Sequence, residues 1–168
     1  MANLKLKGNP VETSGSLPAK GTKAPDFTLV KSDITSLSLS DLKGKTVILN
    51  IFPSIETSTC SASVRKFNQI ATGKPNVVIL GISKDLPFAH NRFCAAEGIA
   101  NVITLSGYRD ASFGKAYGVD VLNGLFGGLY ARCVVIIDPK GTIVYTQQVQ
   151  EMSEEPDYDD VLAALAKL

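Results

Sequence analysis

The sequence predicts an α/β fold in which helices flank a central mixed β-sheet. An apolar, β-rich run at 46–52 is typical of a strand buried on both faces, and strand and helix patterns alternate from there to residue 105. That alternation implies parallel crossovers, whereas the turn signal at 138–141 indicates an antiparallel pair. With 168 residues and 45% hydrophobic content, we expect residues 1–168 to form a single domain.

Residues 1–17 are expected to form an N-terminal β-hairpin extension. Apolar and polar side chains alternate in Leu4–Leu6 and Pro10–Thr13, and the Gly8-Asn9 pair between them tolerates positive φ. These residues lack the continuous apolar core of a secretory signal, and no run in the sequence is long enough to span a bilayer. We therefore expect a cytoplasmic protein with no membrane partner, in a compartment where thiols stay reduced.

The remaining elements follow from side-chain periodicity and from turn residues. Val64, Phe67 and Ile70 recur at helical spacing, so a helix is expected to begin close to Cys60. Gly98 is typical of a residue that follows the end of a helix. The predicted strands are 27–30, 36–39, 46–52, 77–82, 101–105, 132–138 and 142–149, and the later predicted helices are 87–97, 112–117 and 157–168.

The charge balance and the small number of cysteine and histidine residues argue against several functions. The balance of 17 Lys and Arg against 16 Asp and Glu leaves no sustained basic field for a phosphate backbone, so no nucleic-acid partner is expected. The three cysteines form no close cluster and His90 is the single histidine, so a four-ligand zinc site cannot be assembled at the usual spacings. We expect no metal and no cofactor, and the odd cysteine count indicates thiol chemistry or plain burial.

Cys60 is the leading candidate for that chemistry. It lies between a buried strand and the start of a helix, where free backbone N–H groups and the helix dipole stabilise an anion such as a thiolate. The alternative is a buried small hydrophobe, which the flanking Ser and Thr residues disfavour. Thr57, three residues earlier, can present its hydroxyl beside the sulfur or cap the helix, and the two roles are compatible.

Arg132 and Pro53 are the next candidates. Arg132 opens an otherwise apolar strand, where an unpaired guanidinium would be costly to bury. We expect it to reach an anion, with Cys60 as one possibility; the alternative is a strand-end arginine turned to solvent. Pro53 fixes the backbone where the strand before Cys60 ends, and its ring could shield the sulfur, although a lone proline would indicate only a turn.

The other three thiol and imidazole side chains are less informative. Cys94 lies in the predicted helix 87–97, where a buried small residue is the alternative to a redox role. A bond between Cys60 and Cys94 requires Cα atoms within about 7 Å, and otherwise local unfolding must come first. We interpret Cys133, inside an apolar strand, as structural. His90 has no obvious carboxylate partner in its segment, and a surface or partly buried helix position is expected.

The pattern Pro-x-x-x-Thr-x-x-Cys, formed by Pro53, Thr57 and Cys60, resembles the peroxidatic motif of peroxiredoxins. Longer stretches over nearly the whole chain resemble the bacterial thiol peroxidases, the atypical two-cysteine branch of that family. These stretches are 50–55, 63–68, 85–89, 92–94 and 155–158.

The resemblance implies a thioredoxin-like fold with an N-terminal hairpin, a homodimer, and thioredoxin as the reductant. It implies that Cys60 is the peroxidatic cysteine and Cys94 the resolving cysteine, which together form an intramolecular redox disulfide. It also implies that Thr57, Pro53 and Arg132 orient the substrate, hydrogen peroxide or an alkyl hydroperoxide. Cys60 would pass through a sulfenic acid that Cys94 resolves.

Three other functions stay open on sequence grounds. A disulfide oxidoreductase would use Cys-x-x-Cys, but Thr57 occupies the first cysteine position. A cysteine hydrolase would need a histidine base near the nucleophile, and only His90 is available. A non-catalytic redox sensor or binding module shares the first chemical step with a peroxidase, and sustained turnover with thioredoxin distinguishes them.

Overall fold

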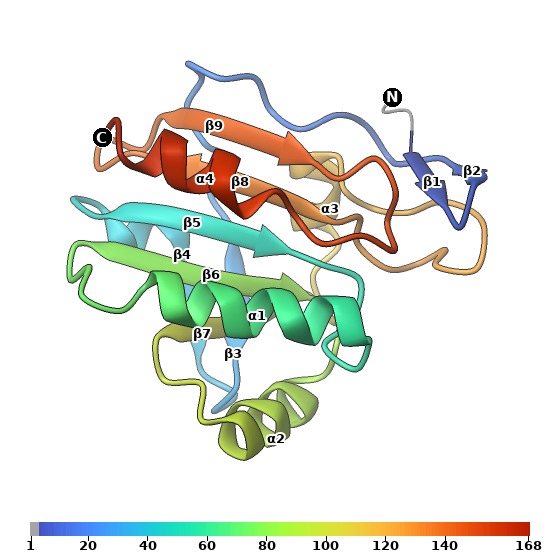
Figure 1. The fold of residues 1–168 in the computed structure, drawn as a ribbon, viewed down its shortest axis with the longest axis horizontal. Coiled ribbons are helices and arrows are strands. Elements are labelled where there is room, and N and C mark those ends of the chain that lie inside the picture. The colour runs from blue at the N-terminus through green and yellow to red at the C-terminus, as the bar shows by residue number, and fades with distance from the viewer. Residues whose placement is uncertain (1–3) are drawn as a thin grey trace.

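The computed structural model describes residues 4–168, in which seven strands form one mixed sheet (Figure 1). The strands are β3 (Thr28–Lys31), β4 (Ser36–Ser38), β5 (Thr46–Ile51), β6 (Val77–Ser83), β7 (Val102–Ser106), β8 (Cys133–Ile137) and β9 (Ile143–Gln148). The helices are the 3₁₀ helix η1 (Leu39–Leu42) and the α-helices α1 (Ser58–Ile70), α2 (Pro87–Glu97), α3 (Ser112–Tyr117) and α4 (Tyr158–Leu165).

The strand order is β4-β3-β7-β6-β5-β8-β9. The β5–β6 and β6–β7 pairs are parallel, whereas β5–β8 and β8–β9 are antiparallel. The predicted mixed sheet and the predicted central strand are therefore confirmed, since β5 is buried throughout and has a neighbour on each side. Because β8 pairs with β5 in the register Ile51↔Cys133, the start of β8 lies beside the end of β5.

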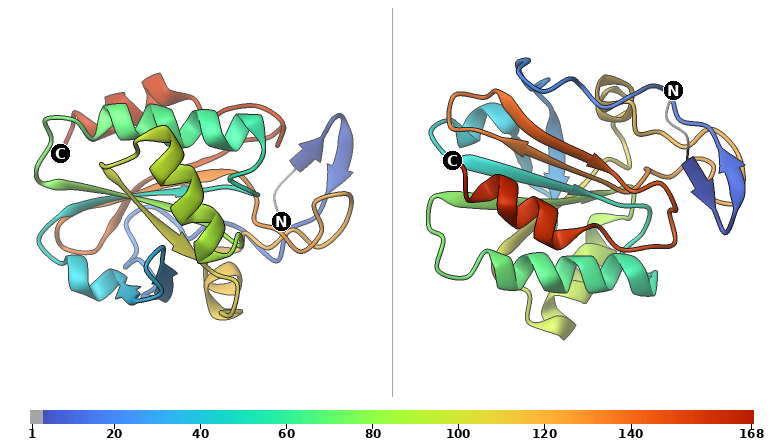
Figure 2. Two further views of the ribbon diagram at one scale, coloured as in Figure 1. Left: turned by 90° about the horizontal axis from the view of Figure 1, so that it is seen from below. Right: turned by 45° about the horizontal axis from the view of Figure 1, so that its top comes forward.

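Two layers of helices cover the sheet (Figure 2). One face carries α1, α2 and α4, and the other carries η1 and α3. The alternation of side chains along β5 supplies both cores: Ile48 packs in the cluster that contains α1 residues, and Val47 and Leu49 pack in the opposite cluster. Of the predicted helices, 87–97 and 112–117 agree with the structure, while α4 is shorter than predicted and η1 was not predicted.

The N-terminal hairpin consists of β1 (Leu4–Leu6) and β2 (Asn9–Val11), and residues 1–3 of the predicted extension lie outside the described residues. Its turn was predicted one residue too late. Lys7 and Gly8 hold the two positive φ angles, 50° and 81°, and Asn9 already pairs with Leu6. The hairpin hydrogen-bonds to the segment after β9 through Lys5, whose N–H donates to the Gln150 carbonyl at 2.8 Å.

None of the helices within residues 4–168 is long and apolar enough to cross a membrane.

Two helix-terminating glycines allow a matched test of packing. Gly98 after α2 and Gly118 after α3 have nearly the same left-handed geometry, with φ of 64° and 66°. A Cβ at Gly98 would meet nothing within 4 Å, whereas one at Gly118 would lie 2.4 Å from the Ser16 carbonyl oxygen. We expect Gly98→Ala to cost about 1 kcal/mol of unfolding free energy and Gly118→Ala at least about 2 kcal/mol more, measured by urea unfolding. Equal losses would contradict the close contact between α3 and residue 16.

Candidate active site

The turn between β5 and α1 positions the Cys60 thiol. Thr57 is the N-cap of α1, and its hydroxyl oxygen accepts a hydrogen bond from the Cys60 amide at 3.3 Å. The same hydroxyl donates to the Ser54 carbonyl at 3.1 Å. Cys60 therefore lies in the first turn of α1, fully buried, at the helix end where the dipole favours an anion. Pro53, also buried, lies in the same turn two residues after β5.

Arg132 reaches this thiol from the position just before β8, which begins at Cys133, one residue later than the predicted strand. Its side chain is only 1% exposed, and its Nη1 lies 3.3 Å from the Cys60 Sγ. Its Nε and Nη2 both donate to the Met152 carbonyl, at 3.1 and 2.9 Å. The structure thus brings Arg132 to the sulfur as expected, and the solvent-facing alternative is wrong. Because the guanidinium is planar, the two bonds to Met152 also fix the direction of the donor that faces Cys60.

The segment that holds Arg132 is itself held by the N-terminal hairpin. The Met152 N–H donates to the Lys5 carbonyl at 2.8 Å. The neighbouring Glu151 carboxylate accepts hydrogen bonds from the Gly8 amide, the Ser153 hydroxyl and the Lys7 amide, which together lower the pKa of Glu151 to about 2. The hairpin therefore supports the position of the Met152 carbonyl, a link that no pattern in the sequence indicated.

The second candidate thiol, Cys94, lies on a different helix from Cys60. All three cysteines are free. Cys94 is half-buried on α2, beside the Thr104 hydroxyl of β7; burial raises the pKa of its thiol and the hydrogen bond with Thr104 opposes that shift. Cys94 packs against the core cluster that contains Cys60. No disulfide joins Cys60 and Cys94 in this structure, in which they lie on the separate helices α1 and α2.

Cys133 has the properties expected of a structural residue. It is fully buried in β8, and burial raises the pKa of its thiol to about 12, while a hydrogen bond from Gln148 and the charge of Arg132 oppose that shift. At neutral pH the thiol is therefore protonated and unreactive.

The expectation for His90 was wrong. It is fully buried, and its Nε2 lies 2.8 Å from the Ser83 Oγ and 3.8 Å from the Asp85 Oδ2. Burial lowers the pKa of His90 to about 4, although the Asp85 charge opposes that shift. The partners precede α2 in the chain, at β6 and the β6–α2 turn, which is why a search within the helix missed them. His90 faces Ser83 and not Cys60, which argues against a Cys–His hydrolase.

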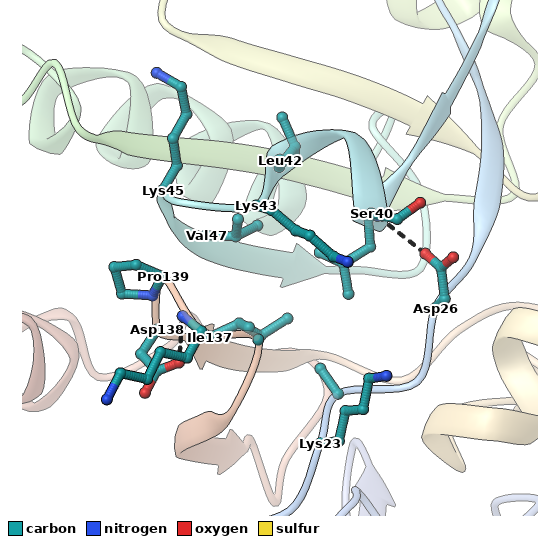
Figure 3. A pocket seen from close by; sticks show the side chains of 14 residues that line it. Lys23, Asp26, Ser40, Leu42, Lys43, Lys45, Val47, Ile137, Asp138 and Pro139 are labelled. Atoms are coloured by element: carbon teal, nitrogen blue, oxygen red, sulfur yellow. Dashed lines mark hydrogen bonds between the residues drawn. The ribbon is translucent and has the colours of Figure 1, made fainter.

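A cavity of about 210 Å³ lies away from these residues, where η1 covers the start of β5 and the end of β8 (Figure 3). Val47 and Ile137 contribute to its lining, and the Asp26 carboxylate at its edge accepts a hydrogen bond from the Ser40 amide at 3.1 Å. Cys60 follows the opposite end of β5, and it does not line this cavity. The cavity is therefore separate from the thiol site.

The fold and the thiol at the start of α1 define a thioredoxin-like redox protein. The model of the Redoxin family matches residues 19–162, and the chain belongs to that family. The chain is 47% identical to the thiol peroxidase of Mycobacterium tuberculosis over 165 residues, which cover 98% of this chain and 99% of the relative.

Solved structures agree with this family assignment. A peroxiredoxin-like protein from Aquifex aeolicus, 37% identical, has a TM-score of 0.93 over 99% of this chain and 98% of that chain. The thiol peroxidase from Chromobacterium violaceum shares the fold at 19% identity, with a TM-score of 0.89 over 98% of this chain and 95% of that chain. The expected thioredoxin-like fold and the expected enzyme class, a peroxidase oxidoreductase, are confirmed by these similarities.

The buried His90 predicts an acid-sensitive stability. Its pKa is about 6.5 in the unfolded chain and about 4 in the folded protein, so acidification adds a proton to the unfolded state first. Stability should be constant above about pH 6.5 and fall as the pH drops towards 4, by about 3 kcal/mol more than in His90→Gln. Urea unfolding of both proteins between pH 7 and 4 measures this difference. Parallel pH profiles would contradict the buried, neutral imidazole.

Proposed function

We propose that the chain is a thiol-dependent peroxidase that reduces hydrogen peroxide and organic (alkyl) hydroperoxides to water or alcohol. Cys60 is the peroxidatic cysteine. The observation that carries this proposal is the contact between the Arg132 Nη1 and the Cys60 Sγ, made inside a buried site at a helix N-terminus. A guanidinium beside a thiol favours the thiolate, which is the nucleophile that peroxides require.

In the first step, the Cys60 thiolate attacks the terminal oxygen of the hydroperoxide. The S–O bond forms as the O–O bond breaks, the sulfur is oxidised to a sulfenic acid, and the departing oxygen leaves as alcohol or water after taking a proton. Donors that face the sulfur stabilise the negative charge on that oxygen. Arg132 supplies one such donor, and the Thr57 hydroxyl, which bonds to the Ser54 carbonyl in the resting structure, supplies another. Pro53 limits access of water to the sulfur.

In the second step, the Cys94 thiol attacks the sulfenic sulfur of Cys60, which forms an intramolecular disulfide and releases water. Thioredoxin then reduces that disulfide by thiol exchange. Burial of Cys94 keeps its thiol protonated while α2 is packed, so opening of α2 both shortens the distance and favours the reactive thiolate. We propose that the whole chain, 1–168, works as a single domain, assembles as a homodimer and acts in the cytoplasm.

Two alternatives are less well supported by the site. A dithiol oxidoreductase would need a second cysteine at the position that Thr57 occupies as the cap of α1. A redox sensor would use the same first step but would not turn over, so repeated peroxide consumption with thioredoxin and its reductase distinguishes the two.

Thiol counting tests the cycle. One equivalent of an alkyl hydroperoxide, added to the reduced protein, should remove two free thiols in the wild type and none in Cys60→Ser. In Cys94→Ser it should remove one and leave a sulfenic acid, detected by mass spectrometry with a dimedone probe. Cys133→Ser is the matched control and should lose two thiols. Retention of all thiols in the wild type would overturn the proposed function.

The role of Arg132 predicts a graded kinetic effect. Arg132→Lys keeps the positive charge but loses the planar guanidinium, whose nitrogens donate to the Met152 carbonyl and the Cys60 sulfur at the same time. We expect the rate constant of Cys60 with hydroperoxide to fall by about 10²-fold, measured by rapid quench and mass spectrometry. Cys133→Ala, one residue along the chain, should leave that rate unchanged. A wild-type rate in Arg132→Lys would show that positive charge alone, without the guanidinium geometry, is sufficient for fast oxidation of Cys60.

A further inference from the structure

Asp85, in the turn between β6 and α2, connects the two cysteine-bearing segments. Its carboxylate accepts hydrogen bonds from the Ser54 hydroxyl at 2.7 Å, the Ile55 amide at 2.7 Å and the Ser83 hydroxyl at 2.5 Å. The side chain is only 11% exposed. Ser54 and Ile55 belong to the turn that precedes Cys60, and Asp85 lies two residues before α2, which carries Cys94.

On the Cys60 side, the contacts continue to the sulfur-bearing residue. Ser54, held by Asp85 through its hydroxyl, accepts hydrogen bonds on its carbonyl from both the Thr57 amide and the Thr57 hydroxyl, each at 3.1 Å. Thr57 in turn caps the Cys60 amide. Displacement of Ser54 would therefore move the hydroxyl that the peroxidase reaction uses.

On the Cys94 side, Asp85 acts through Ser83 and His90. The Ser83 hydroxyl donates its one proton to Asp85, so it accepts from the His90 Nε2–H, 2.8 Å away. His90 is fully buried and lies one helical turn before Cys94 on α2. The Asp85 carbonyl also accepts a hydrogen bond from the Ser106 hydroxyl, which ties the turn to β7. The start of α2 is thus linked, through His90 and Ser83, to the carboxylate that holds the Cys60 turn.

We propose that Asp85 is a positioning residue that couples the two steps of the reaction. With its bonds intact, the Cys60 turn keeps the geometry that reacts with peroxide, and α2 keeps Cys94 away. With its bonds broken, the turn and α2 separate, and the two sulfurs can meet. This inference rests on the proposed function, since it assigns Cys60 and Cys94 to the two steps.

A second contact spans the same two elements but is a weaker candidate. Arg92 of α2 pairs with Glu56 of the Cys60 turn, and their side chains are 62% and 54% exposed. Exposed ion pairs are screened by solvent and contribute little. The Asp85 carboxylate is mostly buried and has three donors, so its loss should have the larger effect on the position of the turn.

The two steps should respond in opposite directions to Asp85→Asn, which keeps the size of the side chain but loses its charge and one acceptor oxygen. We expect the rate constant for oxidation of Cys60 by an alkyl hydroperoxide to fall about tenfold, and the rate constant for disulfide closure to rise about threefold or more. Faster closure also lowers the fraction of Cys60 that excess peroxide converts to sulfinic acid. Rapid quench, thiol trapping and mass spectrometry measure all three quantities.

Asp138→Asn is the matched control. The Asp138 carboxylate also accepts two amide hydrogen bonds in a turn, from Lys140 and Thr142, but between β8 and β9 at the far end of β5 from Cys60. Its two rates should equal those of the wild type. Ser54→Ala removes one of the three bonds to Asp85 and should shift both rates in the same directions as Asp85→Asn, by a smaller factor; it serves as the test if Asp85→Asn does not fold.

The outcomes separate the two hypotheses. If the wild type loses no thiols to peroxide, the proposed function fails. If the wild type reacts, but Asp85→Asn and Ser54→Ala leave both rates unchanged or lower both, the coupling role of Asp85 is overturned while the peroxidase function stands. General destabilisation would lower the oxidation rate in Asp138→Asn as well, which would also overturn the proposal.

Discussion

The buried guanidinium of Arg132 is the constraint on which the site depends. A fully desolvated cation costs several kcal/mol unless acceptors surround it, and here the acceptors are the Met152 carbonyl and the Cys60 sulfur. To supply them, the start of β8, the segment after β9 and the first turn of α1 must converge. The N-terminal hairpin contributes by holding Met152 through Lys5. Four segments remote in sequence are thereby fixed around one sulfur.

This arrangement places opposing demands on the polypeptide. The proposed first reaction needs Cys60 buried and ordered beside its donors, whereas the proposed second reaction needs Cys60 and Cys94 in contact, and the two thiols are carried by the separate helices α1 and α2. A protein that carries out both reactions must have bonds that hold Cys60 beside its donors for the first reaction. The same bonds must break to allow Cys60 and Cys94 to meet in the second. Asp85 is suited to that role because its carboxylate bonds to the Cys60 turn and, through Ser83 and His90, to α2, and because the turn it occupies borders solvent.

The sequence predicted the features that depend on local patterns. The central strand follows from a continuous apolar run, the end of α2 from Gly98, and the position of Cys60 from the change of periodicity after β5. The strand order and the contacts of His90 with Ser83 and Asp85 depend on tertiary packing and have no local signature. The same holds for the Met152 carbonyl, because any residue can supply a backbone acceptor. Arg132 was found because a cation in an apolar strand needs an explanation.

In the proposed reaction, the site stabilises the transition state of peroxide cleavage and does more than produce a thiolate. The most direct test compares the rate constants of Cys60 with an alkyl hydroperoxide and with iodoacetamide, each relative to free cysteine. We expect acceleration of the peroxide reaction by about 10³-fold or more and little acceleration of alkylation, because the donors are placed for a departing oxygen. Equal acceleration of both reactions would contradict it, since that result would require only an activated thiolate.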